Sequence, residues 1–425
     1  MLSCSARNHM LFTPLLASTA SGTLELRSIA QPIRQSAGPE VDFVEGKAVR
    51  VDVEKRQLRY RPTAGGVDYP GLEQSKSYDL MVLGVGAQSN TFGLPGVHAD
   101  RVHFMKELSD ARNLRQAILR KFEWVASAQL SDEEARAALA FVFVGGGPTG
   151  AECAAEVHDL IYQDLARMYP ARVMDAVSVH VVDGKELLGG FDEKLQKYAK
   201  QRFQRQSIHL HLGKVVAGLE DDRVCFTDGT SLPYGVCVWA TGVAPRKFTR
   251  LLSHREFKRS ASGRVQTDEW LRVLREDGAA PQLQPGVFAL GDCADVGSAQ
   301  YAATAQVAEQ QGKYLARTLN DVARRGQLAQ FLEQQADGTP AGRFEYHHAG
   351  SLAYLGGFTA LSDFTKADAA VSRATGLSGK RLTGWLAWLT WRSVYLTQQG
   401  TWRNRLQVPM DWSRTLIFGR DTNDF

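Results

Sequence analysis

Three glycines, Gly145, Gly147 and Gly150, have the spacing of a phosphate-binding loop, G-x-G-x-x-G. They follow an apolar strand pattern directly and precede a helical pattern directly. In a dinucleotide-binding fold the first glycine permits a tight turn, the second lets the backbone approach a pyrophosphate, and the third lets helix and strand pack closely. The helix N-terminus then offers unpaired N–H groups to the phosphates. This arrangement predicts a nicotinamide-dinucleotide site.

Two acidic residues near this loop are candidates for contacts with the nucleotide. Asp183 ends the next strand pattern, where a carboxylate could bind a ribose 2′-OH and would repel a 2′-phosphate, which favours NADH over NADPH. It lies beyond the usual gap of about 20 residues from the motif, so the intervening helix must be longer than usual. A simple turn residue at the end of the strand is the alternative. Glu152 lies two residues after the last glycine, in the expected first turn of the helix. It either interacts with the helix dipole or lies near the nicotinamide.

The elements that would position these residues alternate along the chain. Five near-continuous apolar runs end in glycine or acidic residues, which is typical of buried parallel strands. They cover residues 78–86, 140–147, 177–183, 236–242 and 287–292. Helical periodicity is clearest over residues 151–165 and 306–320. The alternation predicts an α/β fold with doubly wound units.

Length and charge narrow the class of protein. A chain of 425 residues should hold two domains, or three if one is small. The net charge of +4 is too small to suggest a nucleic-acid partner. Residues 376–425 contain seven basic and three acidic side chains, a net charge of +4 in the last fifty residues alone. A basic C-terminal end suits an acidic surface such as a membrane.

The five cysteines form no C-x-x-C pair and no zinc spacing. Unpaired thiols in a reducing compartment are expected, and no metal site is predicted. His347 and His348 are adjacent, but the sequence places no third ligand beside them.

Tryptophan is concentrated near the C-terminus, where Trp385, Trp388, Trp391 and Tyr395 follow helical spacing. Amphipathic aromatic residues beside arginines predict a helix that lies in the membrane interface. A helix docked on the core and a dimer interface are the alternatives. No run approaches the roughly 18 apolar residues of a spanning helix.

Several segments resemble the type II NADH dehydrogenases, the single-subunit NADH:quinone reductases of mitochondria and bacteria. The resemblance runs from about Arg7 to the C-terminus in the family's order, and it is greatest to the mitochondrial form without an EF-hand insertion. The matching segments are LFTPLL (11–16), GAQSNTFGLPG (86–96), GGGPTG (145–150), WATG (239–242), FALGDCA (288–294), AQVAEQQ (305–311) and GSLAYLG (350–356).

The resemblance implies two nested dinucleotide-binding domains of the glutathione-reductase type and a membrane-associating C-terminal segment. Residues 1–115 and 266–330 would form the FAD-binding domain, 116–265 the NADH-binding domain, and 340–425 the C-terminal segment. Independently of the resemblance, the glutamine- and glycine-rich polar composition of residues 326–343 predicts a linker. Gly291 and Asp292 would face the FAD pyrophosphate and ribityl chain. The other cofactor-binding residues carried over are Gly86, Gly145, Gly147, Gly150, Asp183, Gly242 and Ala305.

In the family, the helix that opens at residues 305–311 borders the isoalloxazine ring and the quinone pocket. Ala305 is small enough to let a flat ring approach, and Gln306 could hydrogen-bond flavin or quinone carbonyls. Gln306 and Gln310 are four residues apart and therefore share a face. Glu152, Gln306 and Gln310 are the predicted catalytic residues. An ordinary polar helix face is the alternative for the two glutamines.

The implied reaction passes a hydride from NADH to FAD and two electrons onward to a membrane quinone, without proton pumping. The protein would lie on the mitochondrial inner membrane, or on a bacterial cytoplasmic membrane, and could be a homodimer. A disulfide reductase would need a redox-active cysteine pair, which the sequence lacks. A soluble flavin NADH oxidase remains an alternative.

The sequence departs from the family at its N-terminus. Family members place a strand and a G-x-G-x-x-G loop for FAD before the segment that begins here at Arg7. We expect this loop, and any import signal, to lie upstream of Met1. The alternative is a truncated NADH-binding protein that lacks FAD and catalysis.

Overall fold

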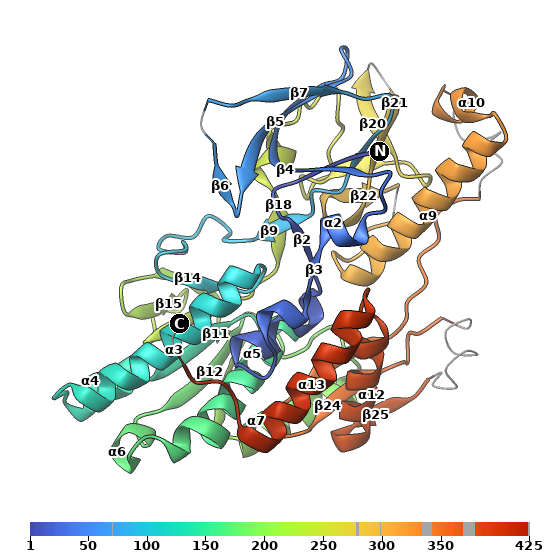
Figure 1. Cartoon of the computed structure of the whole chain (residues 1–425). Helices are drawn as coiled ribbons and strands as arrows, with labels where there is room; N and C mark the ends of the chain where they lie inside the picture. Colours follow the sequence, from blue (N-terminus) through green and yellow to red (C-terminus); the bar gives the residue numbers. More distant parts are fainter. Residues whose placement is uncertain (70, 278–279, 298, 334–341, 369–378, 424–425) are drawn as a thin grey trace. The chain divides into compact units, whose positions relative to one another are not determined.

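The computed structural model divides the chain into two compact units, and each unit is assembled from three chain segments (Figure 1). All residues are described except 70, 278–279, 298, 334–341, 369–378 and 424–425. The first unit comprises Met1–Met10, Pro32–Gln88 and Val243–His347, and the second comprises Leu11–Gln31, Ser89–Gly242 and His348–Phe425. The short strands β2 (His9–Leu11), β3 (Ala30–Pro32) and β9 (Ala87–Ser89) fall where the chain passes from one unit to the other.

A parallel sheet forms the centre of the second unit. Its strands, in spatial order, are β10 (His103–Phe104), β17 (Val236–Trp239), β11 (Ala140–Val144), β12 (Ser178–Asp183) and β13 (Ile208–Leu212). After β11 the chain continues to β12 on one side, whereas β17 pairs with β11 on the other. The end of β11 is therefore a topological switch point, where open α/β sheets bind ligands. The predicted parallel strands over 140–147, 177–183 and 236–242 are confirmed.

Both faces of this sheet are buried, as the continuous apolar runs predicted. On one face, Phe141 and Phe143 of β11 pack in the same core as α3 (Leu108–Ser127) and α5 (Pro148–Asp159). On the other face, Val142 and Val144 pack under the antiparallel sheet of β14 (Val216–Leu219), β15 (Arg223–Phe226) and β16 (Ser231–Pro233). The remaining helices of residues 89–242 are α4 (Asp132–Ala138), α6 (Ala171–Met174) and α7 (Glu193–Arg205).

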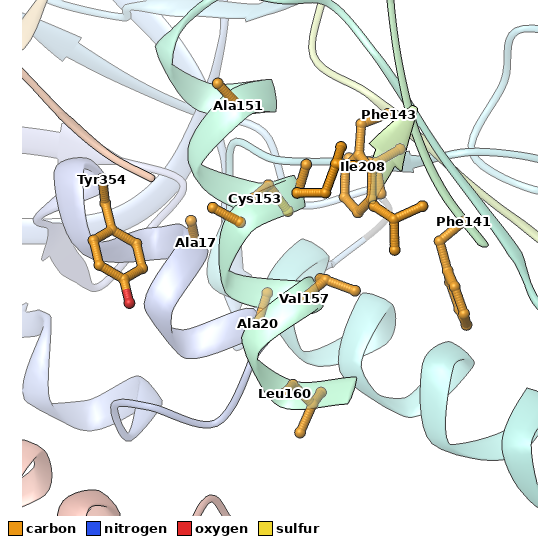
Figure 2. Packing of buried hydrophobic residues seen from close by; sticks show 14 of the residues in the cluster. Ala17, Ala20, Phe141, Phe143, Ala151, Cys153, Val157, Leu160, Ile208 and Tyr354 are labelled. Carbon is orange, nitrogen blue, oxygen red and sulfur yellow. The ribbon is translucent and has the colours of Figure 1, made fainter. Parts of the chain in front are cut away.

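Helix α5 lies between the sheet and a short helix from a distant part of the chain, α1 (Leu16–Ala20). Figure 2 shows Ala17 and Ala20 of α1 facing α5, with Phe141 and Phe143 on the opposite side of α5. Small side chains at this contact let the two helix backbones approach closely. The helical path continues beyond α5 through a π turn at Leu160–Asp164 and a 3-10 turn at Leu165–Arg167, which confirms the helix predicted over 151–165.

The C-terminal segment packs on the same core. It contains an antiparallel sheet of β23 (Ser351–Tyr354), β24 (Ala360–Asp363) and β25 (Arg381–Thr383), followed by α12 (Gly384–Thr397) and α13 (Trp402–Phe418). Trp388, Trp391, Val408 and Trp412 are buried in the core that also holds α5. The helix predicted from the tryptophan spacing is α12, and one of its faces is docked on the core.

The first unit contains two further sheets. One has the order β22 (Ala294–Val296), β19 (Val265–Thr267), β20 (Arg272–Asp277), β21 (Ala280–Ala289) and β8 (Met81–Leu83). The other contains β1 (Leu2–Ser5), β4 (Asp42–Asp52), β5 (Gln57–Ala64), β6 (Val67–Asp68) and β7 (Gln74–Ser77). Strand β18 (Val243–Pro245) and helices α2 (Ile33–Ser36), α8 (Lys247–Leu251) and α9 (Ala305–Arg324) complete most of this unit. The strand predicted over 287–292 and the helix predicted over 306–320 are confirmed, whereas the strand predicted over 78–86 is shorter and covers only Met81–Leu83.

The linker predicted over residues 326–343 is wrong in its first part, because α10 (Leu328–Glu333) forms there. Phe331 of α10 is buried and its ring stacks on that of Phe288 in β21, with 6.1 Å between ring centroids. The polar, glutamine-rich composition concealed one aromatic anchor. Residues 334–341 of the predicted linker lie outside the described residues.

The domain boundaries remain a prediction, although the compact units group three segments differently. Residues 11–31 and 89–115 belong to the unit that holds the glycine loop, whereas 243–265 belong to the other unit. Within the described part of the chain, no helix combines the length and the apolar character needed to cross a bilayer.

Candidate functional site

The glycine loop joins β11 to α5, and two of its glycines are required by the backbone itself. Gly145 has φ +115°, and a Cβ there would lie 2.4 Å from the carbonyl oxygen of Ala240. A Cβ on Gly150 would lie 1.9 Å from the carbonyl oxygen of Gly145. Any side chain at either position would therefore force the loop apart, so these glycines close the turn and the helix–strand contact as predicted.

Gly147 differs from the other two because a Cβ there would meet nothing within 4 Å. It is the N-cap of α5, it makes no side-chain capping hydrogen bond, and Pro148 follows it. Open space above uncapped N–H groups is the geometry that admits a phosphate. The loop therefore fits the pyrophosphate of a dinucleotide.

Asp183 binds the loop from the end of β12. Its Oδ2 accepts a hydrogen bond from the Gly146 N–H at 2.7 Å, and its Oδ1 accepts one from the Lys185 N–H at 2.7 Å. Asp183 thus holds the glycine loop against the neighbouring strand. Each carboxylate oxygen has a second lone pair, so the predicted contact with a ribose hydroxyl stays a prediction.

The carboxyl end of β17 is organised by Asn90, a residue that the sequence analysis missed. The carbonyl oxygen of Asn90 accepts hydrogen bonds from Trp239 Nε1 at 2.8 Å and Thr241 Oγ1 at 3.2 Å. Its N–H donates to the carbonyl oxygen of Gly242 at 3.0 Å. Two segments of the family resemblance, 86–96 and 239–242, therefore meet here. Their pairing could not be inferred from either segment alone.

Glu152 is not in the first turn of α5, because the helix begins at Pro148. The proposed interaction with the helix dipole is therefore wrong. Its side chain is buried, with 8% exposed, and Oε1 accepts hydrogen bonds from the Tyr354 N–H at 3.0 Å and from Trp391 Nε1 at 3.3 Å. Burial raises the pKa of Glu152 to about 8. The structure thus gives a carboxyl group that holds a proton at neutral pH; its catalytic role stays a prediction.

Two more acids extend this face of α5, and the sequence analysis missed both. Glu156 accepts hydrogen bonds from the hydroxyls of Ser18, Ser21 and Thr23, at 2.7, 2.7 and 2.8 Å. Asp159 accepts one from the Tyr354 hydroxyl at 2.6 Å. The spacing of 152, 156 and 159 on an alanine-rich helix was the available signal, since residues four and three apart share a face.

In the first unit, Gly291 and Asp292 follow β21 in a short 3-10 turn. Gly291 has φ +70°, and its N–H donates to Gln311 Oε1 at 2.6 Å. A Cβ on Gly291 would lie 3.3 Å from the Cβ of Ala308 on α9. Because Gly291 has no side chain and Ala308 has a small one, few atoms cover the backbone of this turn. This fits the predicted approach of FAD. Gln311, which is buried and positions this turn, was missed.

Gln306 and Gln310 of α9 contact the same short segment, which confirms that they share a face. Gln306 Oε1 accepts from the Tyr346 hydroxyl at 3.2 Å. Gln310 pairs with the backbone of His347, donating from Nε2 to the carbonyl oxygen at 2.8 Å and accepting at Oε1 from the N–H at 3.0 Å. Ala305 is the first residue of α9 and is exposed. Gly86 has φ +65°. The catalytic and cofactor contacts of these residues stay predictions.

Two known protein families match different ranges of this chain. Residues 1–312 match the pyridine nucleotide-disulphide oxidoreductase family, and residues 348–421 match the NDH2 C-terminal domain. The internal alternative NAD(P)H-ubiquinone oxidoreductase A1, mitochondrial, of Solanum tuberosum is 38% identical over 430 residues, which cover 98% of this chain and 81% of the relative. The chain belongs to the type II NADH dehydrogenases.

A second relative and two solved structures are also similar to this chain. The external NADH-ubiquinone oxidoreductase 2, mitochondrial, of Saccharomyces cerevisiae is 33% identical, covering 99% of this chain and 77% of the relative. NDH2 from Plasmodium falciparum in complex with NADH has a TM-score of 0.85 at 21% identity and covers 99% of this chain and 94% of that chain. The sulfide:quinone oxidoreductase of Aquifex aeolicus reaches 0.65 at 13% identity, covering 99% and 90%. This type II NADH dehydrogenase shares their fold.

The two kinds of glycine in the loop should respond differently to alanine. In Gly150→Ala the Cβ meets a carbonyl oxygen, so we expect a loss of about 1–3 kcal/mol in the free energy of unfolding. In Gly147→Ala the methyl group projects into open space, so stability should hold while NADH binds about tenfold more weakly, a cost of about 1.4 kcal/mol. Urea unfolding and NADH titration measure the two effects. If the two variants lost the same stability and the same affinity for NADH, the proposed contact of Gly147 with the pyrophosphate would be contradicted.

The buried carboxyl group predicts a pH dependence of stability. The folded state keeps the Glu152 proton up to a pKa of about 8, whereas the unfolded chain loses it near the ordinary value of 4.5. Between these values the native state binds more protons, so Glu152 makes the free energy of unfolding fall as pH rises. Glu152→Gln should remove this fall. Unfolding curves across the window measure it, with exposed Glu133→Gln as the control. Parallel pH profiles for Glu152→Gln and wild type would refute the raised pKa.

Proposed function

We propose that this protein is an FAD-dependent NADH:ubiquinone reductase that passes two electrons from NADH to a membrane quinone without pumping protons. The observation that carries the proposal is the glycine loop at the switch point of a parallel sheet, in a chain of this family. Bound FAD supplies the redox chemistry, accepting a hydride from NADH and returning two electrons to a quinone. The chain itself binds, orients and shields the reactants.

NADH binds at the carboxyl end of β11 in this proposal. The open surface at Gly147 receives the pyrophosphate, and the α5 N-terminus stabilises its negative charge. Asp183 holds the loop and offers its remaining lone pairs to the adenosine ribose. Because a carboxylate there repels a 2′-phosphate, NADH is the preferred nucleotide.

The flavin side of the proposal rests on residues of the first unit. Gly291 and Asp292 accommodate the FAD pyrophosphate and the ribityl hydroxyls, and Gln311 holds their turn in place. Gln306 and Gln310 lie on one face of α9, the helix that borders the flavin and the quinone in this proposal.

A quinone takes up two electrons and two protons to form a quinol. The hydride of NADH carries two electrons and one proton, so the overall reaction consumes one further proton for each NADH. In this proposal the carboxyl group of Glu152 holds a proton. It stays protonated at neutral pH because burial raises the pKa of Glu152 to about 8. A general acid is most effective when its pKa lies near the working pH.

Peripheral binding to a membrane, the mitochondrial inner membrane by analogy with the relatives, is the proposed location. Helices α12 and α13 each bury one face and expose an apolar face. On α13 the exposed side chains include Trp402, Leu406, Met410 and Ile417, which are 77%, 65%, 68% and 71% exposed. Their spacing puts them on one side of the helix. A large exposed apolar patch marks a membrane or protein interaction site, and the basic charge of this segment favours a membrane.

Electron acceptance distinguishes the proposed function from its rivals. Purified protein supplied with FAD should oxidise NADH much faster with a short-chain ubiquinone than with oxygen alone. NADH consumption, oxygen uptake and quinol formation, followed in parallel, provide the measurement. Oxygen uptake equal to NADH consumption would indicate an NADH oxidase. Binding of NADH without any turnover would indicate an inactive NADH-binding protein.

Charge on the exposed face of α13 should release the protein from membranes. The triple variant Leu406→Glu, Met410→Glu and Ile417→Glu leaves the buried tryptophans in place, whereas deletion of the segment would also remove Trp388 and Trp412 from the core. We expect the triple variant to lose binding to liposomes while keeping NADH oxidation with a soluble acceptor. Exposed Met168→Glu is the matched control. Unchanged liposome binding together with a shift from dimer to monomer would assign this face to a homodimer interface instead.

A further inference from the structure

Arg392 of α12 is held between two tryptophan rings. Its guanidinium carbon lies 4.1 Å from the ring centroid of Trp388 on the same helix and 4.3 Å from that of Trp412 on α13. Its Nε is buried and has no hydrogen-bond partner. Among the residues that the structure describes, Arg392 forms no ion pair with a carboxylate. This cation is therefore fixed in place with no carboxylate in contact, and the buried Glu156 of α5 acts on it only across a distance.

The tryptophan rings compensate only part of the cost of removing this cation from water. Burial lowers the pKa of Arg392 to about 10, the direction expected for a desolvated cation. Cation–π contacts stabilise the charge but leave the N–H donors of the guanidinium unused. The stacked plane also restricts the guanidinium to one orientation, which lowers the entropy cost of binding a ligand there.

The position of Arg392 on α12 indicates where such a ligand comes from. Leu389 lies three residues before it and Leu396 four residues after it, so all three are on the same side of the helix. Leu389 is exposed, and Trp385, one further turn away, is 58% exposed. Arg392 thus borders the exposed apolar face of α12, at its contact with α13.

Neither helix supplies a carboxylate that pairs with Arg392, and Glu156 of the neighbouring α5 opposes the lowering of its pKa by burial without forming an ion pair with it. Helix α12 contains no acidic residue. The one acid of α13, Asp411, is buried and accepts hydrogen bonds from the Ser28 hydroxyl at 2.7 Å and the Glu25 N–H at 3.0 Å. Since none of these acids forms an ion pair with Arg392, a group that pairs directly with its guanidinium must be supplied by a ligand.

We propose that Arg392, clamped between Trp388 and Trp412, binds the phosphate of an anionic phospholipid. The inference rests on the proposed membrane association, because the apolar faces of α12 and α13 bring the guanidinium to headgroup depth. A planar guanidinium forms two parallel hydrogen bonds with phosphate oxygens. A headgroup with net negative charge also neutralises the cation, which a zwitterionic headgroup does not. Arg392 would thus make the enzyme select anionic lipid rather than any apolar surface.

The test compares variants on vesicles of phosphatidylcholine alone and of phosphatidylcholine mixed with phosphatidylglycerol. Wild type should bind the mixed vesicles more tightly, and Arg392→Gln should lose about fivefold of that binding, the effect of one basic residue at a membrane surface. Binding to phosphatidylcholine alone should not change. Arg392→Lys keeps the charge but loses the stacked plane, so it should behave like Arg392→Gln. Exposed Arg403→Gln on α13 is the matched control and should lose much less.

The outcomes separate the inference from the function on which it rests. Lys restoring full binding, or Arg403→Gln losing as much as Arg392→Gln, would show that only general charge matters and would overturn the site. A raised KM of Arg392→Gln for a soluble short-chain quinone, with vesicle selectivity intact, would assign Arg392 to the quinone and also overturn it. Failure of wild type to bind either vesicle would instead contradict the proposed membrane association.

A measurement on wild type alone covers the case in which the variants fold poorly. Below their micelle-forming concentrations, short-chain phosphatidylglycerol and phosphatidylcholine can be titrated separately against the holoenzyme. Tryptophan fluorescence should change saturably with the anionic lipid only, since Trp388 and Trp412 frame the site. Identical titrations with the two lipids would overturn the proposal.

Discussion

The structure depends on the hydrogen bonds that replace water around three acids on one buried face of α5. Glu152, Glu156 and Asp159 lose water on folding, and a buried carboxyl group is costly unless it is protonated or hydrogen-bonded. The hydrogen-bond donors to these acids come from different segments of the chain. Hydroxyls at Ser18, Ser21 and Thr23 surround Glu156, while Tyr354 and Trp391 reach Glu152 and Asp159. This network explains why residues 11–31 and the C-terminal segment fold with the dinucleotide-binding sheet.

The far end of the chain closes the same network. Arg420 donates from Nε to Thr23 Oγ1 at 2.9 Å and from Nη1 to Asp164 Oδ2 at 2.7 Å. Arg115 forms an ion pair with Asp421 at 2.7 Å. Residues 420 and 421 are therefore tied to α3 and to the π turn that follows α5. Removing one partner from such a network leaves a buried charge uncompensated, which costs more than the pair itself contributes.

Helices α12 and α13 each have one face buried in the core and another face that is exposed. Trp388, Trp391 and Trp412 pack inward, whereas Trp385 and Trp402 are exposed. A core-docked helix and an interfacial helix were posed as alternatives from the sequence. Each helix is docked through one face and exposes apolar side chains on another, so docking leaves the proposed interfacial role open. The buried faces hold the segment on α5, so the exposed faces keep a fixed orientation for binding to a surface.

Much of the fold around the nucleotide loop could be predicted from the sequence. Apolar runs and turn glycines are local properties, so the strands over 140–147, 177–183 and 236–242 and the roles of Gly145 and Gly150 followed from order and spacing. The family resemblance supplied the reaction class. What remained hidden was long-range pairing: Asn90 with residues 239–242, the hydroxyls of residues 18–23 with Glu156, and Arg392 between two indoles. Sequence spacing determines which residues share a face of one element. Only the tertiary structure decides which face of another element they meet, because that depends on how every packed and hydrogen-bonded group is satisfied at once.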